Sequence, residues 1–307
     1  MPETKYMTAG ALSLPPEVSD EILQKAQQAS AIMRLASKVT LPGRGVKIPM
    51  ITSDAEADWV SEGGVKPVSK PGASLKYMEA YKIASIVVFS KEFTRDARSL
   101  YDALVRRLPN SISVAFDKTV IGAKVRPGEN FDILSSCTAQ SLIASVGHSA
   151  YNGLVAADTD IAEHDGFLSG FAMSPQARGI LLNSTDSTGR PLFNQIDSRD
   201  IPTLLSAPVY FNKGMYKAGA AGEGTAPGTP AIVGVAGDWA QCKYGIVNDL
   251  TLDLNDKGVV TYVNESEQTV SINLWQQNMV AVLVEASLGF IADTSCFNLL
   301  TGATPAS

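Results

Sequence analysis

The chain contains little of the chemistry that catalysis and metal binding require. It has only two histidines, His148 and His164, in 307 residues, and neither belongs to an HExxH pair or to a recognisable nucleophile arrangement. The cysteines number three and form no pair motif, which argues against a disulfide framework and against a thiolate metal site. We therefore expect no catalytic residues, no metal and no cofactor, and we expect Cys137, Cys242 and Cys296 to be ordinary buried thiols.

Long apolar runs and clusters of positive charge are missing as well. No window approaches the eighteen uninterrupted apolar residues of a membrane span, and the N-terminus lacks the basic and apolar regions of a secretory signal. We expect no membrane partner, and we expect the protein to work in the cytoplasm where it is made. The net charge is −6 and the densest positive spot is Arg106-Arg107, which disfavours sequence-specific DNA binding.

The chain is 45% hydrophobic and 18% charged, which is enough to form substantial cores in one or two domains. Its first periodic segment is a predicted helix over 17–38, after Pro15-Pro16. The apolar stripe of this helix is thin and rich in alanine, which favours an arm that lies on another surface over a core helix. Packing onto its own subunit is the alternative. The stripe consists of Val18, Ile22, Ala26, Ala29, Met33 and Ala36.

A long polar excursion over 53–74 carries the apolar pair Trp59-Val60. Connections of this length are usually functional or disordered, and the apolar pair favours function. We expect the strands at 46–50 and 81–89 to flank the excursion as a two-stranded tongue, which needs a partner because an isolated hairpin is marginal in water. Trp59 is then predicted to anchor a neighbouring subunit. The alternative is a hydrophobic plug over its own domain.

The longest periodic segment starts at Ser90, a good helix N-cap, and ends near Gly122. At 1.5 Å per residue its nearly thirty residues predict roughly 45 Å of helix, kinked at Pro109. A helix of this length would be the spine of its domain. The apolar stripe consists of Phe93, Ala97, Leu100, Leu104, Leu108, Ile112, Phe116 and Val120.

The remaining residues predict a second domain over 126–240 and a return of the chain in strands. We expect helices over 135–146 and 161–168, then a strand over 171–174 that leads into a helix over 175–182. The returning strand segments are 246–254, 259–263 and 274–287, and residues 290–300 close the chain.

The order of these segments resembles that of the major capsid proteins of tailed bacteriophages, which share the Hong Kong 97-type fold. The resemblance covers about residues 15–300, and it rests on the order and spacing of motifs that are individually weak. These motifs are Ala57–Gly64, Tyr81–Phe93, Phe116–Gly122, Met173–Pro175, Asp186–Leu192 and Gly237–Trp239. The resemblance implies an α+β fold with an N-terminal arm over 1–45, an extended E-loop hairpin over 46–89 and a peripheral (P) domain spine helix over 90–125. It also implies an axial (A) domain over 126–240, P-domain strands over 241–288 and a C-terminal segment over 289–307.

For function, the resemblance implies a head protein, not an enzyme, that self-assembles as pentamers and hexamers into the icosahedral shell of a virion. Its expected partners are other copies of itself, a separate scaffolding protein and a portal, and it would enclose double-stranded DNA without sequence-specific binding. An encapsulin-like bacterial nanocompartment shell is the alternative, and a hydrolase with residues 53–74 as a lid is a third, disfavoured by the scarcity of histidine. The predicted subunit-interface residues are Trp59, Val60, Glu62, Lys66, Lys70, Ile22 and Met33.

Some relatives crosslink an E-loop lysine to an asparagine of a neighbour with the help of a glutamate. Lys66, Lys70 and Lys76 lie on the corresponding loop, and Asn264 or Asn273 would be the acceptor. No glutamate in the sequence stands out as the catalyst, which disfavours crosslinking in this protein.

Overall fold

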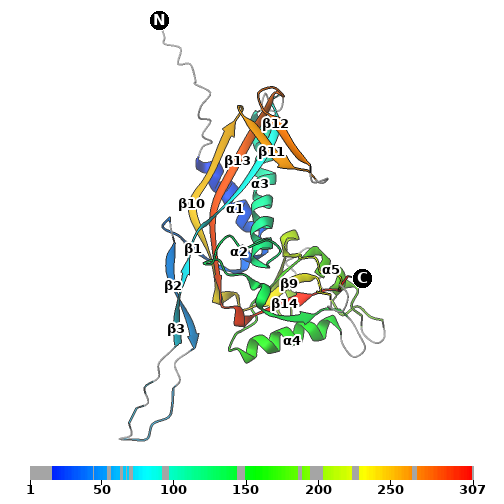
Figure 1. Cartoon of the computed structure of the whole chain (residues 1–307). Helices are drawn as coiled ribbons and strands as arrows, with labels where there is room; N and C mark the ends of the chain where they lie inside the picture. The colour runs from blue at the N-terminus through cyan, green and yellow to red at the C-terminus, as the bar shows by residue number, and fades with distance from the viewer. Residues whose placement is uncertain are drawn as a thin grey trace.

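Two sheets and a long helix form the body of the protein in a computed structural model (Figure 1). The structure describes residues 16–43, 45–53, 57–62, 65–66, 68, 72–91, 97–143, 149–185, 189–193, 203–222, 228–264 and 268–305. The mixture of helices and sheets confirms the expected α+β class.

A four-stranded sheet has the order β1-β10-β13-β4, with β1 parallel to β10 and the other pairs antiparallel. Its strands are β1 (Ser37–Thr40), β10 (Cys242–Asn255), β13 (Met279–Ala292) and β4 (Tyr81–Ser90). The helix α3 (Ala97–Val120) packs against this sheet, as the spine prediction requires, and Pro109 lies inside it. The contact is made by Leu108, Ile112, Phe116 and Val120 of α3 with β13 residues such as Val282, Leu288 and Phe290.

The N-terminal segment is two helices rather than the single predicted helix over 17–38. The helix α1 (Pro16–Ala29) stops at Ser30, and α2 (Ala31–Leu35) follows before the chain enters β1. Ser30 has extended backbone angles, and its Oγ accepts a hydrogen bond from the N–H of Met33 at 3.0 Å. The prediction of an unbroken helix is wrong because serine can cap a new helix in place of continuing the old one.

A six-stranded sheet has the order β5-β14-β9-β6-β8-β7 and lies between two cores. Its strands are β5 (Thr138–Ser141), β14 (Phe297–Thr301), β9 (Ile232–Gly237), β6 (Gly170–Met173), β8 (Ala207–Phe211) and β7 (Thr203–Leu204). Alternate side chains point to opposite faces: Phe171 and Met173 join the core under α4 (Ala150–Glu163) and α5 (Pro175–Leu182), whereas Ala172 joins the core around α3. Short 3₁₀ turns η2 (Leu134–Ser136), η4 (Lys213–Met215), η5 (Trp239–Gln241) and η6 (Thr294–Cys296) link the strands.

The predictions in this region succeed where the local signals are strong. The strand β6 and the helix α5 are confirmed. The helix predicted over 135–146 is wrong, since the chain forms the turn η2 and then β5, which pairs with β14. The short helix predicted over 161–168 is also wrong, because α4 already contains Ile161 and the chain turns at Asp165 with a φ of 58°.

A separate two-stranded hairpin projects from the body (Figure 1). It consists of β2 (Val46–Ser53) and β3 (Gly72–Met78), so the predicted pairing of 46–50 with 81–89 is wrong. Residues 81–90 are β4 instead and pair with β13 in the body, because their apolar content suits a half-buried strand. A second hairpin, β11 (Val259–Val263) with β12 (Thr269–Asn273), lies at the opposite end of the four-stranded sheet.

Candidate subunit-interface surfaces

The base of the β2–β3 hairpin is fixed to the body by a small core of its own. Ile48 and Met78 are buried against Leu41 and Ile291. Met78 packs directly over the backbone of Gly245, where a Cβ atom would lie 2.4 Å from the Met78 sulfur. The direction of the hairpin is therefore set by packing of its base against the sheet behind it.

A lysine adds a polar clamp to the same base. The Lys76 Nζ donates to Asp132 Oδ2 at 2.9 Å and to the Ala292 carbonyl at 2.6 Å. The N–H of Ala292 also donates to Asp132 Oδ2, at 3.0 Å. Lys76 is thus a structural lysine of the hairpin base, and its ammonium group is engaged rather than free to react with a neighbour.

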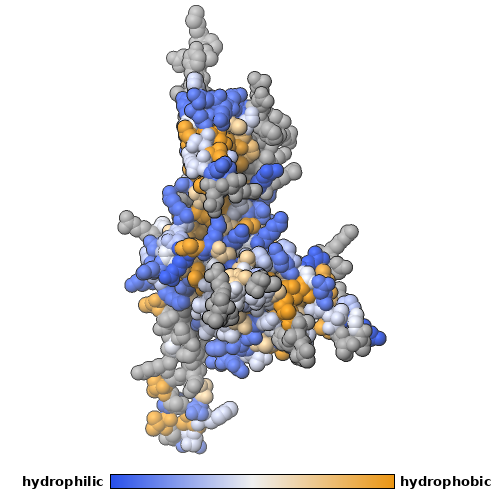
Figure 2. Space-filling view, turned by 45° about the vertical axis from the view of Figure 1, so that its right-hand side comes forward, coloured by the Kyte–Doolittle hydropathy of each residue, from blue (hydrophilic) through white to orange (hydrophobic). Residues whose placement is uncertain are grey.

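The far end of the hairpin exposes the apolar residues that the sequence singled out. The Trp59 side chain is 102% exposed, and Val60 is exposed beside it. The alternative in which Trp59 plugs its own domain is therefore not what the structure shows. Val65 and Val68 are almost fully exposed as well. Figure 2 shows hydrophobic side chains gathered at the end of this projection.

The polar residues predicted for the interface lie on the same projection. Glu62 and Lys66 are exposed beyond the last paired residues of β2 and β3. Lys70 lies outside the described residues. The structure therefore brings Trp59, Val60, Glu62 and Lys66 together on one tip.

The N-terminal helices behave differently, because they pack onto their own subunit. Met33 is buried in the main core together with Leu23, Ala26 and Ile32. This burial corrects the expectation that Met33 lies at a subunit interface, and it supports the alternative that the segment packs on its own chain. Ile22 belongs to α1, and its side chain lies outside the described residues.

A buried carboxyl group fixes the break between α1 and α2. Asp117 of α3 is fully buried; Ser30 Oγ donates to its Oδ1 at 2.6 Å, and the N–H of Ala31 donates to its Oδ2 at 3.1 Å. Burial raises the pKa of Asp117 to about 7, although the hydrogen bonds from Ser30, Ala31 and Ile32 oppose the rise. Asn212 adds a further tie, since its Nδ2 donates to the Ala29 carbonyl at 2.6 Å.

Sequence reasoning missed a second set of exposed apolar side chains, at the β11–β12 end of the protein. Val259, Tyr262 and Val263 are exposed on β11, and Trp275, just after β12, is 72% exposed. A tryptophan among the polar residues of the turn after β12 was the available signal. The elongated body thus carries exposed aromatic residues at both ends.

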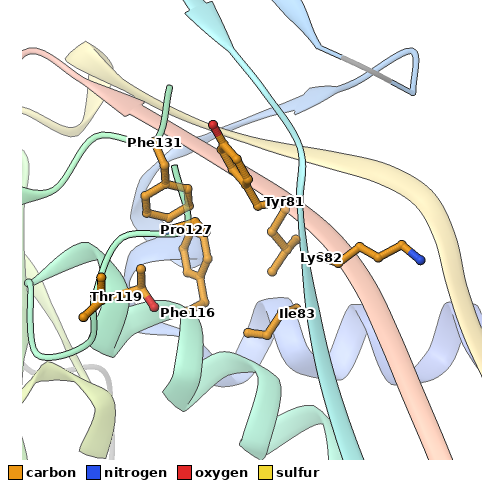
Figure 3. Close-up of a pocket in the computed structure, with 9 residues that line it drawn as sticks. Tyr81, Lys82, Ile83, Phe116, Thr119, Pro127 and Phe131 are labelled. Atoms are coloured by element: carbon orange, nitrogen blue, oxygen red, sulfur yellow. The ribbon is translucent and has the colours of Figure 1, made fainter. Parts of the chain in front are cut away.

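One small pocket opens between the start of β4, the end of α3 and the segment that follows α3 (Figure 3). Its volume is ≈ 90 Å³, and Tyr81, Phe116 and Phe131 form its aromatic wall. Tyr81 and Phe116 both meet Phe131 edge to face, with centroid separations of 6.3 and 6.1 Å. The Tyr81 hydroxyl donates to Glu79 Oε2 at 2.9 Å, which lowers the pKa of Glu79 together with a larger effect from Asn130.

The described residues offer no evident centre for metal chemistry, since no three His, Cys, Asp or Glu side chains gather among them. Cys242 and Cys296 are buried and Cys137 is half-buried, as expected for ordinary thiols, and burial raises the pKa of Cys137 to about 12. No helix within the described ranges is both long and apolar enough to cross a bilayer.

Comparison with known proteins identifies a family. The model of the "Phage capsid family" matches residues 10–293. The chain is 28% identical over 286 residues to "Probable major capsid protein gp17" of Mycobacterium phage L5, covering 90% of this chain and 85% of that protein. A structure from Mycobacterium phage Cain aligns with a TM-score of 0.65 at 20% identity, covering 91% of this chain and 92% of that one. A structure described as "Capsid of empty GTA particle computed with C5 symmetry" aligns with a TM-score of 0.60 at 15% identity, covering 99% and 95%.

Proposed function

The chain belongs to the phage capsid family, and we propose that its copies assemble as pentamers and hexamers into the icosahedral shell of a tailed bacteriophage. Its function is that of a major capsid protein, since the matched relatives carry that name over most of their length. The encapsulin-like alternative is not favoured by these relatives. As a member of a structural capsid family, the protein is proposed to act without enzymatic activity.

The observation that carries the proposal is the exposed apolar tip on a firmly held stem. Trp59 has no cover from the described residues of its own subunit, whereas Met78 at the base of the same hairpin is fully buried. Tryptophan is enriched at the energetic centres of protein interfaces. A projection that is rigid at its base and apolar at its end is suited to reach across to a neighbouring copy.

We further propose that the subunit has the Hong Kong 97-type division of labour. The β2–β3 hairpin would be the E-loop, α3 with the four-stranded sheet the P domain, and the six-stranded sheet with α4 and α5 the A domain near each axis. Residues 1–45 would be the arm, although α2 and β1 within it pack into the subunit's own core and sheet. The strand β14 lies in the six-stranded sheet, so the C-terminal segment would belong with the A domain.

The proposed partners follow from the role of a shell. A separate scaffolding protein and a portal would take part in assembly in the host cytoplasm, and the finished shell would enclose double-stranded DNA as part of the virion. The net charge of −6 suits a container whose contents must slide during packaging and exit. Interlocked contacts in such a shell are expected to exceed roughly 2,000 Å² for each interface.

A pair of tryptophan substitutions tests the proposal. Trp59→Ala should leave the melting temperature of dispersed subunits unchanged and should impair shell formation, because this side chain is exposed in the subunit. Trp239→Ala is the matched control, since the Trp239 ring is buried and its Nε1 donates to the Gly170 carbonyl at 2.8 Å. That variant should lower the melting temperature. Sedimentation velocity and negative-stain microscopy that find no shells for the unaltered protein, or normal shells for Trp59→Ala, would contradict the proposal.

A further inference from the structure

The hairpin tip has an acidic chemistry that limits where it can dock. Residues 48–65 include Asp54, Glu56, Asp58 and Glu62 and no lysine or arginine. Of these, Asp58 and Glu62 are described and exposed, on either side of Trp59 and Val60. A receptor for this tip should therefore offer an apolar hollow with positive charge at its rim.

The pocket beside the end of α3 has these properties. Val125 at its mouth is 92% exposed, and the adjoining Lys124 and Arg126 are exposed as well. Residues 118–126 contain three cationic residues and no acid. None of the ion pairs recorded between described residues involves Lys124 or Arg126. The rim is thus positively charged in a chain that is acidic overall.

The acids near this pocket weaken its charge little. The Glu79 carboxylate is already bound, because Tyr81 and Asn130 both donate to its Oε2, at 2.9 and 3.1 Å. Glu129 is exposed farther along the same segment. Lys82 also lines the pocket, but its Nζ pairs with Glu285 at 3.2 Å and points away from the aromatic wall in Figure 3.

The volume of the pocket selects one side chain of the tip. A cavity of about 150 Å³ holds a benzene molecule, so a pocket of ≈ 90 Å³ admits an aliphatic side chain and not an indole. Val60 fits this limit, and the larger Trp59 would lie against Val125 and Pro127 at the mouth. The aromatic wall of the pocket is held by edge-to-face contacts, so little order has to be gained on binding.

The tip cannot reach the pocket of its own subunit. The seven residues of β3 span roughly 23 Å at about 3.3 Å per residue, and the tip lies beyond that stem, away from the body (Figure 1). We propose that the pocket between β4 and the end of α3 receives Val60 from a second copy's hairpin, with Lys124 and Arg126 facing Asp58 and Glu62 of that hairpin. This inference rests on the proposed function and names the partner surface of the tip.

Charge exchange provides the test. The first variant combines Asp58→Lys with Glu62→Lys, the second combines Lys124→Glu with Arg126→Glu, and the third carries all four substitutions. Each of the first two should raise the protein concentration needed for shell formation by about tenfold, because attractive pairs become repulsive. The third should return to within about threefold of the unaltered protein, because its pairs are attractive again.

Sedimentation velocity measures the assembly concentration, and the melting temperature of dispersed subunits checks the fold, which these exposed substitutions should preserve. Failure of the four-fold variant to recover, or no effect of the rim variant, would overturn the docking site while leaving the capsid function standing. Absence of shells from the unaltered protein would instead count against the proposed function itself.

A covalent trap gives an independent measurement. Val60→Cys combined with Val125→Cys, oxidised with diamide after assembly, should give a ladder of covalent oligomers on denaturing gels. Each single variant should remain monomeric, which controls for the half-buried Cys137. A double variant that assembles but gives no ladder would overturn the proposed contact.

Discussion

The buried carboxyl group of Asp117 makes a prediction whose sign changes with pH. Its pKa rises from the ordinary value of 3.8 to about 7 in the folded subunit, because burial disfavours the charged form. Between these values the folded protein binds a proton that the unfolded chain releases. The stabilising contribution of Asp117 is therefore complete below about pH 4 and is lost as the pH rises through about 7. A shift of this size corresponds to roughly 4 kcal/mol.

Replacing Asp117 with asparagine removes this dependence and introduces a smaller, constant cost. The side-chain amide cannot accept from both Ser30 Oγ and the N–H of Ala31, so one buried donor loses its acceptor, at a cost of about 1–3 kcal/mol. Relative to the unaltered protein, the variant should be less stable by about that amount near pH 4.5. Near pH 8.5 the gain of roughly 4 kcal/mol should outweigh the cost and make the variant the more stable protein.

Urea unfolding of dispersed subunits, followed by tryptophan fluorescence between pH 4.5 and 8.5, measures the difference. The unfolding free energy of Asp117→Asn minus that of the unaltered protein should increase with pH across neutrality. Asp158→Asn, at an exposed position on α4, is the control and should show no such change. A difference for Asp117→Asn that stays constant within about 0.5 kcal/mol over this range would refute the reasoning.

Three further outcomes are expected. Ser30→Ala should lower the unfolding free energy by about 2–4 kcal/mol in urea titrations, since it removes both the cap of α2 and a donor to Asp117; an unchanged midpoint would contradict this. Gly153→Ala should lower the melting temperature, because its Cβ atom would lie 2.1 Å from the Ser141 carbonyl oxygen. The matched Gly179→Ala, in the helix α5 with open space around it, should instead stabilise by up to about 1 kcal/mol; equal effects of the two changes would refute the packing argument. Denaturing gels of intact shells should show only monomer bands, because Lys76 is held by Asp132 and no catalytic glutamate is evident; covalent oligomers would overturn that expectation.

The sequence contained the information for features that depend on neighbours along the chain. The spine helix follows from a stripe of apolar residues at helical spacing, and α5 follows from the serine-proline start at Ser174. The exposed tip was predictable because Trp59 is out of place in a polar segment. In each case the deciding residues lie within a few turns of one another.

Features that depend on distant residues could not be predicted in this way. The break at Ser30 is stabilised by Asp117, 87 positions away, and β5 is a strand because β14 pairs with it from the other end of the chain. β3 was missed because glycine, serine and lysine give it weak strand character, and β2 supplies its only pairing. Met33 was misplaced for a related reason: an alanine-rich stripe is as suitable for close packing on its own core as for a neighbour's surface.

The position of β14 means that this subunit cannot be partly built. The strand is formed by residues 297–301, yet it lies between β5 and β9 inside the six-stranded sheet. Its successive residues Leu299 and Leu300 enter the two different hydrophobic cores on either side of that sheet. During synthesis both halves of the molecule therefore wait for the same late residues, and a nascent chain on the ribosome lacks the finished surfaces with which to join a growing particle.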